Sequence, residues 1–524
     1  MRKVKVLLAL ICIILPVCFT EGLCESQVLP ADVAEALEKA GENRAELEKV
    51  LAHYQTRDDS LKLKAAYFLV GNMEDHCYVS YMLCDTSGAE LDFDVLDYPD
   101  FDALLAAFDS LEELYGPLDF ERKDKVYDLE AISFDLLVEN IDYAFKAWKE
   151  KPWAQDLSFE QFCQYILPHR GSNEPLESWR RVFWEKYANV ADNLENPEDP
   201  IEVAAKINDD IKTWFGFDPR YYYHPTDLGL SEMLETGLGR CEDMTNLTIY
   251  AMRANGLAVT SDYTPYWANT GNNHAWNAIV LADGRSIPFM GAESNPGRYK
   301  LANLLAKAYR KTYSKQYNNL IFQERKQESV PGWLGGKYYT DVTSSYTNVA
   351  SPIIKFSKEI PDSVDIAYIC VFNSGKWKAI EWARINNGSA EFTDLGTDIV
   401  YLPALYMNEE IVPYAPPVIL REDGTLEEIQ ADQSRTSAVE LKAITFRKQV
   451  ISTDGIGETS LNPGDEYELF YWEEGWKSLG RKMASDKPLI FENVPKGGLY
   501  WLTAVGSDNE ERIFTIEDRQ QIWW

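Results

Sequence analysis

The sequence predicts an α+β multidomain protein with a helical N-terminal region, a mixed α+β core and two C-terminal β-sandwich domains. Apolar residues recur at helical spacing between about residues 30 and 230, and one helix is mixed with strands between 230 and 300. Short runs of Tyr, Trp, Val and Ile, separated by turn residues, follow beyond about 340. A chain of 524 residues also exceeds the roughly 250 to 300 residues at which single cores stop growing.

The acidic composition argues against a nucleic-acid partner. The net charge is −33, from 51 Lys and Arg against 84 Asp and Glu. Nucleic-acid binding needs clustered basic residues, so we expect no nucleic-acid partner. Hydrophobic content of 45% and aromatic content of 13% are typical of a packed globular protein.

Residues 1–24 are interpreted as a signal peptide. Basic Arg2, Lys3 and Lys5 precede an apolar run, 6–17, that is too short to span a bilayer. The sequence therefore predicts an exported protein, periplasmic or on the cell surface.

The cleavage position has two alternatives. The stretch before Cys18 loosely resembles a bacterial lipoprotein cleavage site, with Cys18 as the lipidated residue. Ordinary cleavage near Gly22 or Ser26 is the other alternative. Any membrane attachment is expected only through such an N-terminal lipid.

The mature cysteines fit neither a zinc site nor a disulfide framework. They are Cys77, Cys84, Cys163, Cys241 and Cys370, and their spacings match no zinc template. We expect no metal and no cofactor. Pairing of Cys77 with Cys84 is left open.

Residues 25–204 are predicted to form a helical N-terminal domain. The segments "ADVAEALEKAGENRAELEKVLAHY" and "SFEQFCQYILPHRGSNEPLESWRRVFWEKYANV" place apolar residues at helical spacing with charges between them. Within the second segment His169 neighbours Arg170 and Glu174, a pattern that favours a structural polar cluster over substrate contact.

The C-terminal part contains an internal repeat. A shift of 99 residues superimposes "YICVFNSGKWKAIEW" on "YELFYWEEGWKSLGR". We interpret residues 340–433 and 434–524 as two immunoglobulin-like β-sandwich domains. Their repeated aromatic residues either fill small cores or, if exposed, contact glycan.

Cys241 is the candidate nucleophile. Gly237 and Gly239 form a turn before a helix in which Met244 begins an apolar stripe, so Cys241 lies in the first helical turn. The helix N-terminus favours a thiolate there, whereas the charges of Glu242 and Asp243 oppose it.

His274 is the candidate base and Glu293 the candidate acid. Asp283-Gly284 between apolar flanks predicts a two-residue hairpin turn. Such a turn pairs residues whose numbers sum to 567, so His274 is predicted to face Glu293. A thiol at a helix start, with a histidine oriented by an acid, is the arrangement that acyl transfer by cysteine requires.

These residues resemble the transglutaminase-like superfamily, which has a papain-like cysteine-enzyme fold. The resemblance rests on Gly-x-Cys at a helix start, "RANGLAV" after it, and His-Ala-Trp before a hairpin, and we assign the core to 205–335. It implies Cys241 as nucleophile and His274 as base.

The sequence departs from the family pattern at the acid. The family has an aspartate on the second hairpin strand, where this chain has Ser-Ile-Pro-Phe-Met at 286–290. By the predicted pairing Met290 points away from the side of His274, which leaves Glu293 as the nearest acid. The sequence does not place the family's oxyanion donor: Tyr221, Tyr222, Tyr223 and His224 lie upstream in a suitable region, and the backbone N–H of Cys241 is the generic candidate.

Two functions follow from this resemblance. The first is an exported cysteine enzyme acting on amide or peptide bonds, with hydrolysis slightly favoured over transfer, on a protein, peptide or glycopeptide substrate. The second is a catalytically degenerate scaffold whose β-sandwich domains bind glycan or protein.

Overall fold

The computed structural model describes residues 29–56, 59–192, 194–301, 303–356, 358–447, 457–507 and 511–524. The signal peptide predicted at 1–24, with Cys12, Cys18 and Cys24, lies outside these residues. Within the described ranges no helix combines the length and the apolar character needed to cross a membrane.

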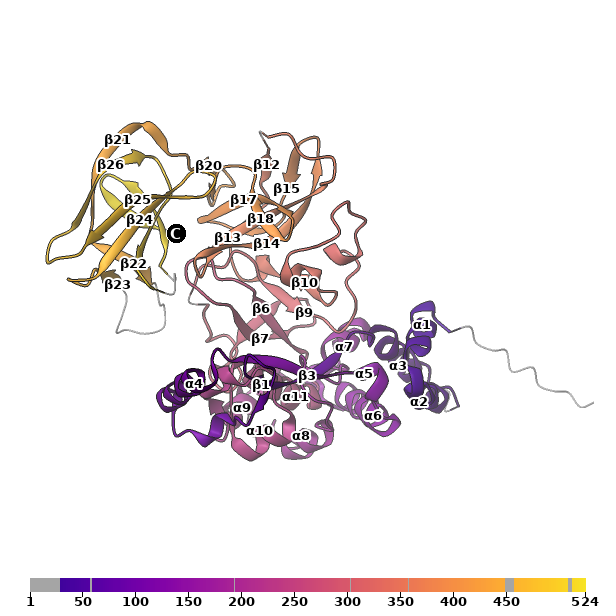
Figure 1. Ribbon diagram of the computed structural model, residues 1–524. Helices are drawn as coiled ribbons and strands as arrows, with labels where there is room; N and C mark the ends of the chain where they lie inside the picture. Colours follow the sequence, from indigo (N-terminus) through magenta and orange to yellow (C-terminus); the bar gives the residue numbers. More distant parts are fainter. Residues whose placement is uncertain are drawn as a thin grey trace, which may run out of the picture.

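Helices dominate the N-terminal region, as the sequence predicts (Figure 1). In the first of them Val33, Ala36 and Leu37 recur at helical spacing, and all three are buried. The helices up to residue 211 are α1 (Ala31–Lys39), α2 (Arg44–Thr56), α3 (Ser60–Asn72), α4 (Phe101–Tyr115), α5 (Asp128–Ala131), α6 (Phe134–Glu150), α7 (Phe159–Tyr165), α8 (Arg180–Lys186) and α9 (Pro200–Ile211). Short 3-10 helices lie at Gly41–Asn43, Val95–Asp97 and Pro152–Ala154.

A three-stranded sheet interrupts these helices, and the helical pattern did not predict it. Its order is β2 (Glu90–Leu91), β1 (Cys77–Cys84), β3 (Asp119–Tyr127), all antiparallel. The run "CYVSYMLC" is rich in β-branched and aromatic residues, which favour a strand. Cys77 and Cys84 lie at opposite ends of β1 as free thiols, so a disulfide between them is excluded.

The helix predicted after the glycine-rich turn is the centre of the core. Helix α11 (Cys241–Ala254) follows α10 (Leu230–Thr236), whose end is formed by Gly237 in the left-handed conformation at φ +65°. The predicted stripe of Met244, Leu247, Ala251 and Ala254 is buried.

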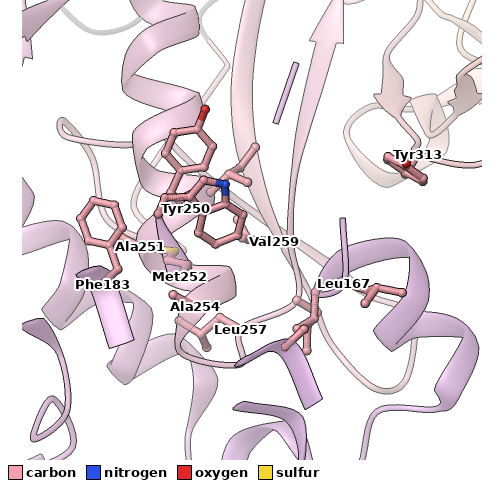
Figure 2. Packing of buried hydrophobic residues seen from close by; sticks show 14 of the residues in the cluster. Leu167, Phe183, Tyr250, Ala251, Met252, Ala254, Leu257, Val259 and Tyr313 are labelled. Carbon is pink, nitrogen blue, oxygen red and sulfur yellow. The ribbon is translucent and has the colours of Figure 1, made fainter. Parts of the chain in front are cut away.

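From Asp243 onward the rest of that helix is buried as well, because α6, α8 and α9 pack around it. Figure 2 shows Phe183 of α8 packed beside Tyr250, Ala251 and Met252 of α11. The helix is therefore a fixed support for whatever its N-terminus carries.

A five-stranded antiparallel sheet packs against α11. Its order is β10, β9, β6, β7, β8, and the helix contacts β6 and β7. The strands are β6 (Val259–Thr264), β7 (His274–Val280), β8 (Ser286–Phe289), β9 (Tyr309–Lys311) and β10 (Tyr339–Asp341), and the two-residue strands β4 (Gly216–Phe217) and β5 (Leu238–Gly239) pair nearby in parallel. Further 3-10 helices lie at Pro219–Tyr223, Leu320–Phe322, Gly332–Gly335 and Thr343–Ser345.

Two β-rich modules follow the core, and Figure 1 shows them as the orange and yellow parts of the chain. The first has the strands β11 (Val349–Ala350), β12 (Ile353–Lys355), β13 (Ile366–Asn373), β14 (Lys376–Asn386), β15 (Ser389–Glu391), β16 (Leu395–Gly396), β17 (Ile399–Met407), β18 (Glu410–Pro413), β19 (Val418–Leu420) and β20 (Leu426–Glu428). The second has β21 (Asp432–Leu441), β22 (Ala443–Arg447), β23 (Gly457–Ser460), β24 (Glu466–Trp472), β25 (Trp476–Met483), β26 (Leu489–Lys496), β27 (Tyr500–Ala504), β28 (Ile513–Glu517) and β29 (Gln520–Trp523).

The internal repeat corresponds to equivalent strands in the two modules. The 99-residue shift found in the sequence places the hairpin β13–β14 on the hairpin β24–β25. Tyr401 donates its hydroxyl hydrogen to the carbonyl of Gly396, five residues upstream, and Tyr500 does the same to Pro495. Such tyrosine corners are a feature of immunoglobulin-like sandwiches.

The repeated aromatic residues meet between the modules. Phe372 of the first module lies 5.3 Å from Trp501 and 5.7 Å from Trp476 of the second, measured between ring centroids. Trp377 lies 5.5 Å from Trp472 in the same way. These aromatics therefore join the two modules through a shared hydrophobic cluster.

Candidate functional site

The predicted nucleophile begins the central helix. Cys241 is the first residue of α11 and Arg240 is its N-cap. The carboxylate of Asp243 accepts the backbone N–H of Arg240 at 2.9 Å and that of Leu228 at 2.8 Å, which fixes this helix start. Gly239 is needed beside it, because a Cβ there would lie 2.7 Å from the Cβ of Asp243.

A pocket of about 460 Å³ lies at this helix start, and Cys241 and His274 both line it. Phe217 and Tyr222 form part of its wall with side chains 47% and 54% exposed, so water has access to the pocket. The other lining residues are Arg240, Glu242, Met244, Asn272, Asn273, Met290 and Glu293.

The thiol of Cys241 is hydrogen-bonded to the side chain of the next residue, Glu242. Its Sγ donates to Oε2 of Glu242 at 3.0 Å. Burial, and then the charge of Glu242, raise the pKa of the Cys241 thiol far above its ordinary value. Both effects act against the stabilisation of a thiolate that a helix N-terminus provides.

His274 stands at the start of β7, opposite Thr264 of β6. Its Nε2 is 2.6 Å from the hydroxyl oxygen of Tyr299, and its ring stacks on Trp267 with centroids 5.9 Å apart. Burial lowers the pKa of His274 below its ordinary value, although Glu242 opposes this shift. The imidazole is therefore neutral near pH 7 and able to accept a proton.

The hairpin after His274 has a different register from the predicted one. Ala278 faces Pro288 and Val280 faces Ser286, so paired numbers sum to 566 and not to 567. The backbone N–H of Leu281 donates to the carbonyl of Arg285, which gives a three-residue loop. Only Gly284 in that loop has a positive φ, at +86°, whereas the predicted type I′ turn needs two such residues.

This shift of one residue changes which side chains lie beside His274. Strand β8 ends at Phe289, so the predicted cross-strand pairing of His274 with Glu293 does not form. Met290 was predicted to point away from the side of His274, but it lines the same pocket and is 2% exposed. Met290, from the segment in which the family pattern has a carboxylate, thus lines the same pocket as His274.

Glu293 also lies in the pocket wall, but it is an exposed residue. Among the described residues, the side-chain hydrogen bond of His274 is to Tyr299 and none is to Glu293. The charge of Glu293 does reach Tyr299, where it contributes, after burial, to a raised pKa of that hydroxyl. Its role as the acid stays a prediction.

One of the residues at 221–224 reaches the pocket. Tyr222 lines it, whereas Tyr221 is buried and Tyr223 packs edge-on against Phe108, with ring centroids 4.8 Å apart. The backbone N–H of Cys241 belongs to the first helical turn, whose amides have no acceptor within the helix.

The residues around His169 form a buried polar cluster. Nε2 of His169 is 2.8 Å from Oδ2 of Asp128, and Nε of Arg170 donates to the same oxygen at 2.7 Å. Burial alone would raise the pKa of Asp128, but Arg170 and His169 hold it well below its usual range. The carbonyl of Arg170 accepts a hydrogen bond from Arg253 of α11 at 2.9 Å, so the cluster supports the helix.

The site contains contacts that the sequence patterns did not single out. Tyr299 lies in an irregular segment with no periodic pattern, and Trp267 lies in a loop, so neither had a motif to identify it. In the parts of the chain that the structure describes, no group of three or more His, Cys, Asp or Glu is arranged to hold a metal ion.

Comparisons with known proteins place this site within a known kind of domain. Residues 188–289 match the family model of the transglutaminase-like superfamily, a span that includes both Cys241 and His274. No curated protein matches the chain.

One solved structure similar to the chain is the crystal structure of red sea bream transglutaminase. The two chains are 9% identical, and the alignment covers 86% of this chain and 78% of that one with a TM-score of 0.18. A TM-score this low carries no argument, so the assignment rests on the family model.

Proposed function

Because the chain carries a transglutaminase-like domain, we propose that it is a cysteine enzyme acting on amide or peptide bonds. The observation that carries this proposal is the convergence of Cys241 and His274 on one water-accessible pocket. We propose Cys241 as the nucleophile and His274 as the general base.

The proposed reaction begins with a proton transfer. His274 takes the thiol proton as the sulfur attacks the substrate carbonyl carbon, and the backbone N–H of Cys241 faces the oxyanion that forms. The imidazolium then protonates the leaving amine, which departs and leaves a thioester. Water, with His274 again as base, releases the carboxylic acid and restores the thiol.

Tyr299 replaces a carboxylate in orienting the imidazole. Its hydroxyl holds Nε2 at 2.6 Å, which leaves the other ring nitrogen, Nδ1, for the thiol. A hydroxyl stabilises an imidazolium less than a carboxylate does, so we expect a weaker base than in a Cys-His-Asp site.

Access of water supports hydrolysis over transfer. Tyr222, Phe217 and Glu293 are exposed at the pocket, so a thioester on Cys241 would be within reach of water. We further propose export, with a protein, peptide or glycopeptide as the substrate. Glycan contact through the β-rich modules is a separate proposal, and the aromatics packed between the modules do not add to it.

Labelling with an amide-derived electrophile that forms a thioether at catalytic cysteines tests the proposal. We expect wild-type protein to be labelled at Cys241 before any other described thiol, because Cys77, Cys84, Cys163 and Cys370 are buried. Cys241→Ala should lose the label, and Cys163→Ala, which removes a thiol whose pKa burial raises to about 12, should keep it. Equal labelling of Cys241 and Cys163 in folded protein would contradict the proposal.

A degenerate scaffold is the second candidate. Met290 in the pocket wall and the hydrogen bond from the Cys241 thiol to Glu242 favour it. In that case Cys241 would react with iodoacetamide no faster than a free thiol of the same exposure, and the rate would not depend on His274.

A further inference from the structure

The loop that ends at His274 is held by the two β-rich modules. Residues 265–273 connect β6 to β7, and Asn272 and Asn273 line the pocket beside His274. This loop thus forms one wall of the candidate site, and its position decides where the imidazole lies.

Asn373 of the first module binds this loop at three points. It is the last residue of β13 and is 2% exposed. Its Nδ2 lies 3.0 Å from the carbonyl oxygen of Trp267, 3.0 Å from that of Thr270 and 2.9 Å from that of Asn272. Three carbonyl oxygens thus share the two hydrogens of this amide, and only a donor group at this position can bind them.

Arg512 of the second module reaches the same loop. It is 3% exposed, and its guanidinium donates to the carbonyl oxygens of Ala268 in the loop, of Phe372 in β13 at 2.7 Å, and of Trp524 at 3.0 Å. Burial lowers the pKa of Arg512 to about 9. Burying a guanidinium costs free energy because its charge is removed from water. Here the buried group joins three separate segments of the chain.

The held loop contacts the imidazole directly. The Trp267 ring stacks on His274, and the backbone N–H of Trp267 donates to the carbonyl oxygen of Asn272 at 3.2 Å. Asn272 has a left-handed backbone at φ +71°, which the Asn373 contact to its carbonyl helps to maintain.

We propose that Asn373 and Arg512 are positioning residues of the candidate active site. They act through the loop 265–273 to keep the ring of His274 partly buried in the wall of the pocket. This inference rests on the proposed function for its consequence in catalysis, but the hold on the loop is measurable without activity.

Hydrogen–deuterium exchange and histidine NMR of the full chain test this inference. Asn373→Asp keeps the size of the side chain but turns an oxygen towards the three carbonyl oxygens. Exchange in the peptide spanning 265–273 should rise about ten-fold or more, because buried acceptors lose their donor. With only five histidines in the chain, the titration of His274 can be followed individually, and its pKa should rise towards the ordinary value as the ring gains water.

A second variant and a matched control complete the test. Asn373→Ala removes the donor without adding charge, and it should give the same changes if Asn373→Asp folds poorly. Asn319 also donates from a buried amide to backbone carbonyls, those of Gly336 and Tyr339, but it does not line the pocket. Asn319→Asp should leave exchange at 265–273 and the His274 titration unchanged.

Three results separate the outcomes. Faster loop exchange and a raised His274 pKa in the Asn373 variants alone would support the inference, even if Cys241 proves unreactive and the proposed function fails. Wild-type exchange in the loop of both Asn373 variants would overturn it. An equal rise in Asn319→Asp would also overturn it, since the effect would then be general loosening.

Discussion

His169 is a buried imidazole and His274 a partly buried one, and their surroundings are opposite. His169 is 2.8 Å from the carboxylate of Asp128, which also binds Arg170, and all three are almost fully enclosed. His274 is bound by a hydroxyl, that of Tyr299, and shares a water-accessible pocket with a half-buried thiol.

The contrast shows that a histidine–carboxylate pair is no marker of chemistry by itself. The cluster around His169 is joined to α11 by the hydrogen bond from Arg253 to the carbonyl of Arg170, which suits a structural role. His274 has no hydrogen bond to a carboxylate among the described residues, but it shares a pocket with the thiol of Cys241 and its imidazole is neutral. The experiments below change one side of this comparison at a time.

Loss of each imidazole should have the largest and most different effects. His274→Ala should lower the alkylation rate of Cys241 near pH 7 by about 10²-fold, because general-base assistance is lost. His169→Ala should leave that rate within about two-fold of wild type, but should lower the free energy of unfolding by about 1 to 3 kcal/mol, because Asp128 loses a buried partner. Iodoacetamide kinetics and urea unfolding measure the two effects.

The pH profile checks the same point in wild-type protein. Burial lowers the pKa of His274, so its neutral form persists below pH 6.5, the usual midpoint of histidine. Base-assisted alkylation should therefore continue below pH 6.5 and disappear as the pH falls through the lowered pKa. A profile identical in wild type and His274→Ala would show that the imidazole does not assist.

Glu242→Gln should have the next largest effect, in the opposite direction. Its carboxylate contributes, after burial, to the raised pKa of the Cys241 thiol, and its removal should lower that pKa. Each unit of such a fall multiplies the thiolate fraction by ten, so we expect alkylation at pH 7 to rise about ten-fold. Arg240→Gln, which removes the opposing charge, should lower the rate. A slower reaction in Glu242→Gln would instead indicate that Glu242 itself accepts the thiol proton.

Met290→Asp would place a carboxylate in the pocket that His274 lines, as a counterpart to the carboxylate of Asp128 beside His169. The added charge should raise the pKa of His274 and increase Cys241 alkylation at pH 7 by roughly two- to five-fold, through a stronger base. Histidine NMR and alkylation kinetics measure both. Met290→Asn, which has the same shape without the charge, should change neither, and equal effects of the two variants would refute the electrostatic account.

Glu293→Gln should have the smallest effect if Tyr299 orients the imidazole. The hairpin pairing predicted from the sequence would make Glu293 the acid, with a fall in alkylation of about ten-fold or more. From the exposed position of Glu293 we expect a change below about two-fold. Alkylation rates of Glu293→Gln and Tyr299→Phe, measured together, decide which residue orients the ring.

The sequence predicted those parts of the site that depend on local pattern. A glycine turn, a first-turn cysteine and an apolar stripe at helical spacing specify α11, and His-Ala-Trp begins β7 as expected. The register predicted for the hairpin was wrong by one residue, because Asp283 does not adopt the positive φ that a type I′ turn requires. This shift of one residue in the register decides whether Met290 faces the pocket.

The other missed features depend on long-range contacts. Tyr299 reaches His274 from an irregular segment, and the sheet β2-β1-β3 forms inside a region whose average pattern is helical. No local periodicity encodes either arrangement, since each is stabilised by residues distant in the chain.

The hold of Asn373 and Arg512 on the loop before His274 has a consequence for the order of folding. Asn373 follows Trp267 by 106 residues, and Arg512 follows Ala268 by 244. During synthesis, domains fold in order from the N-terminus. The thiol, its helix and the imidazole are therefore made well before Arg512, and we expect the pocket wall to be completed only when the second β-rich module docks. A chain that stops before residue 512 would carry both chemical groups without this contact, so we expect the pocket wall to take its described position only after Arg512 has been made.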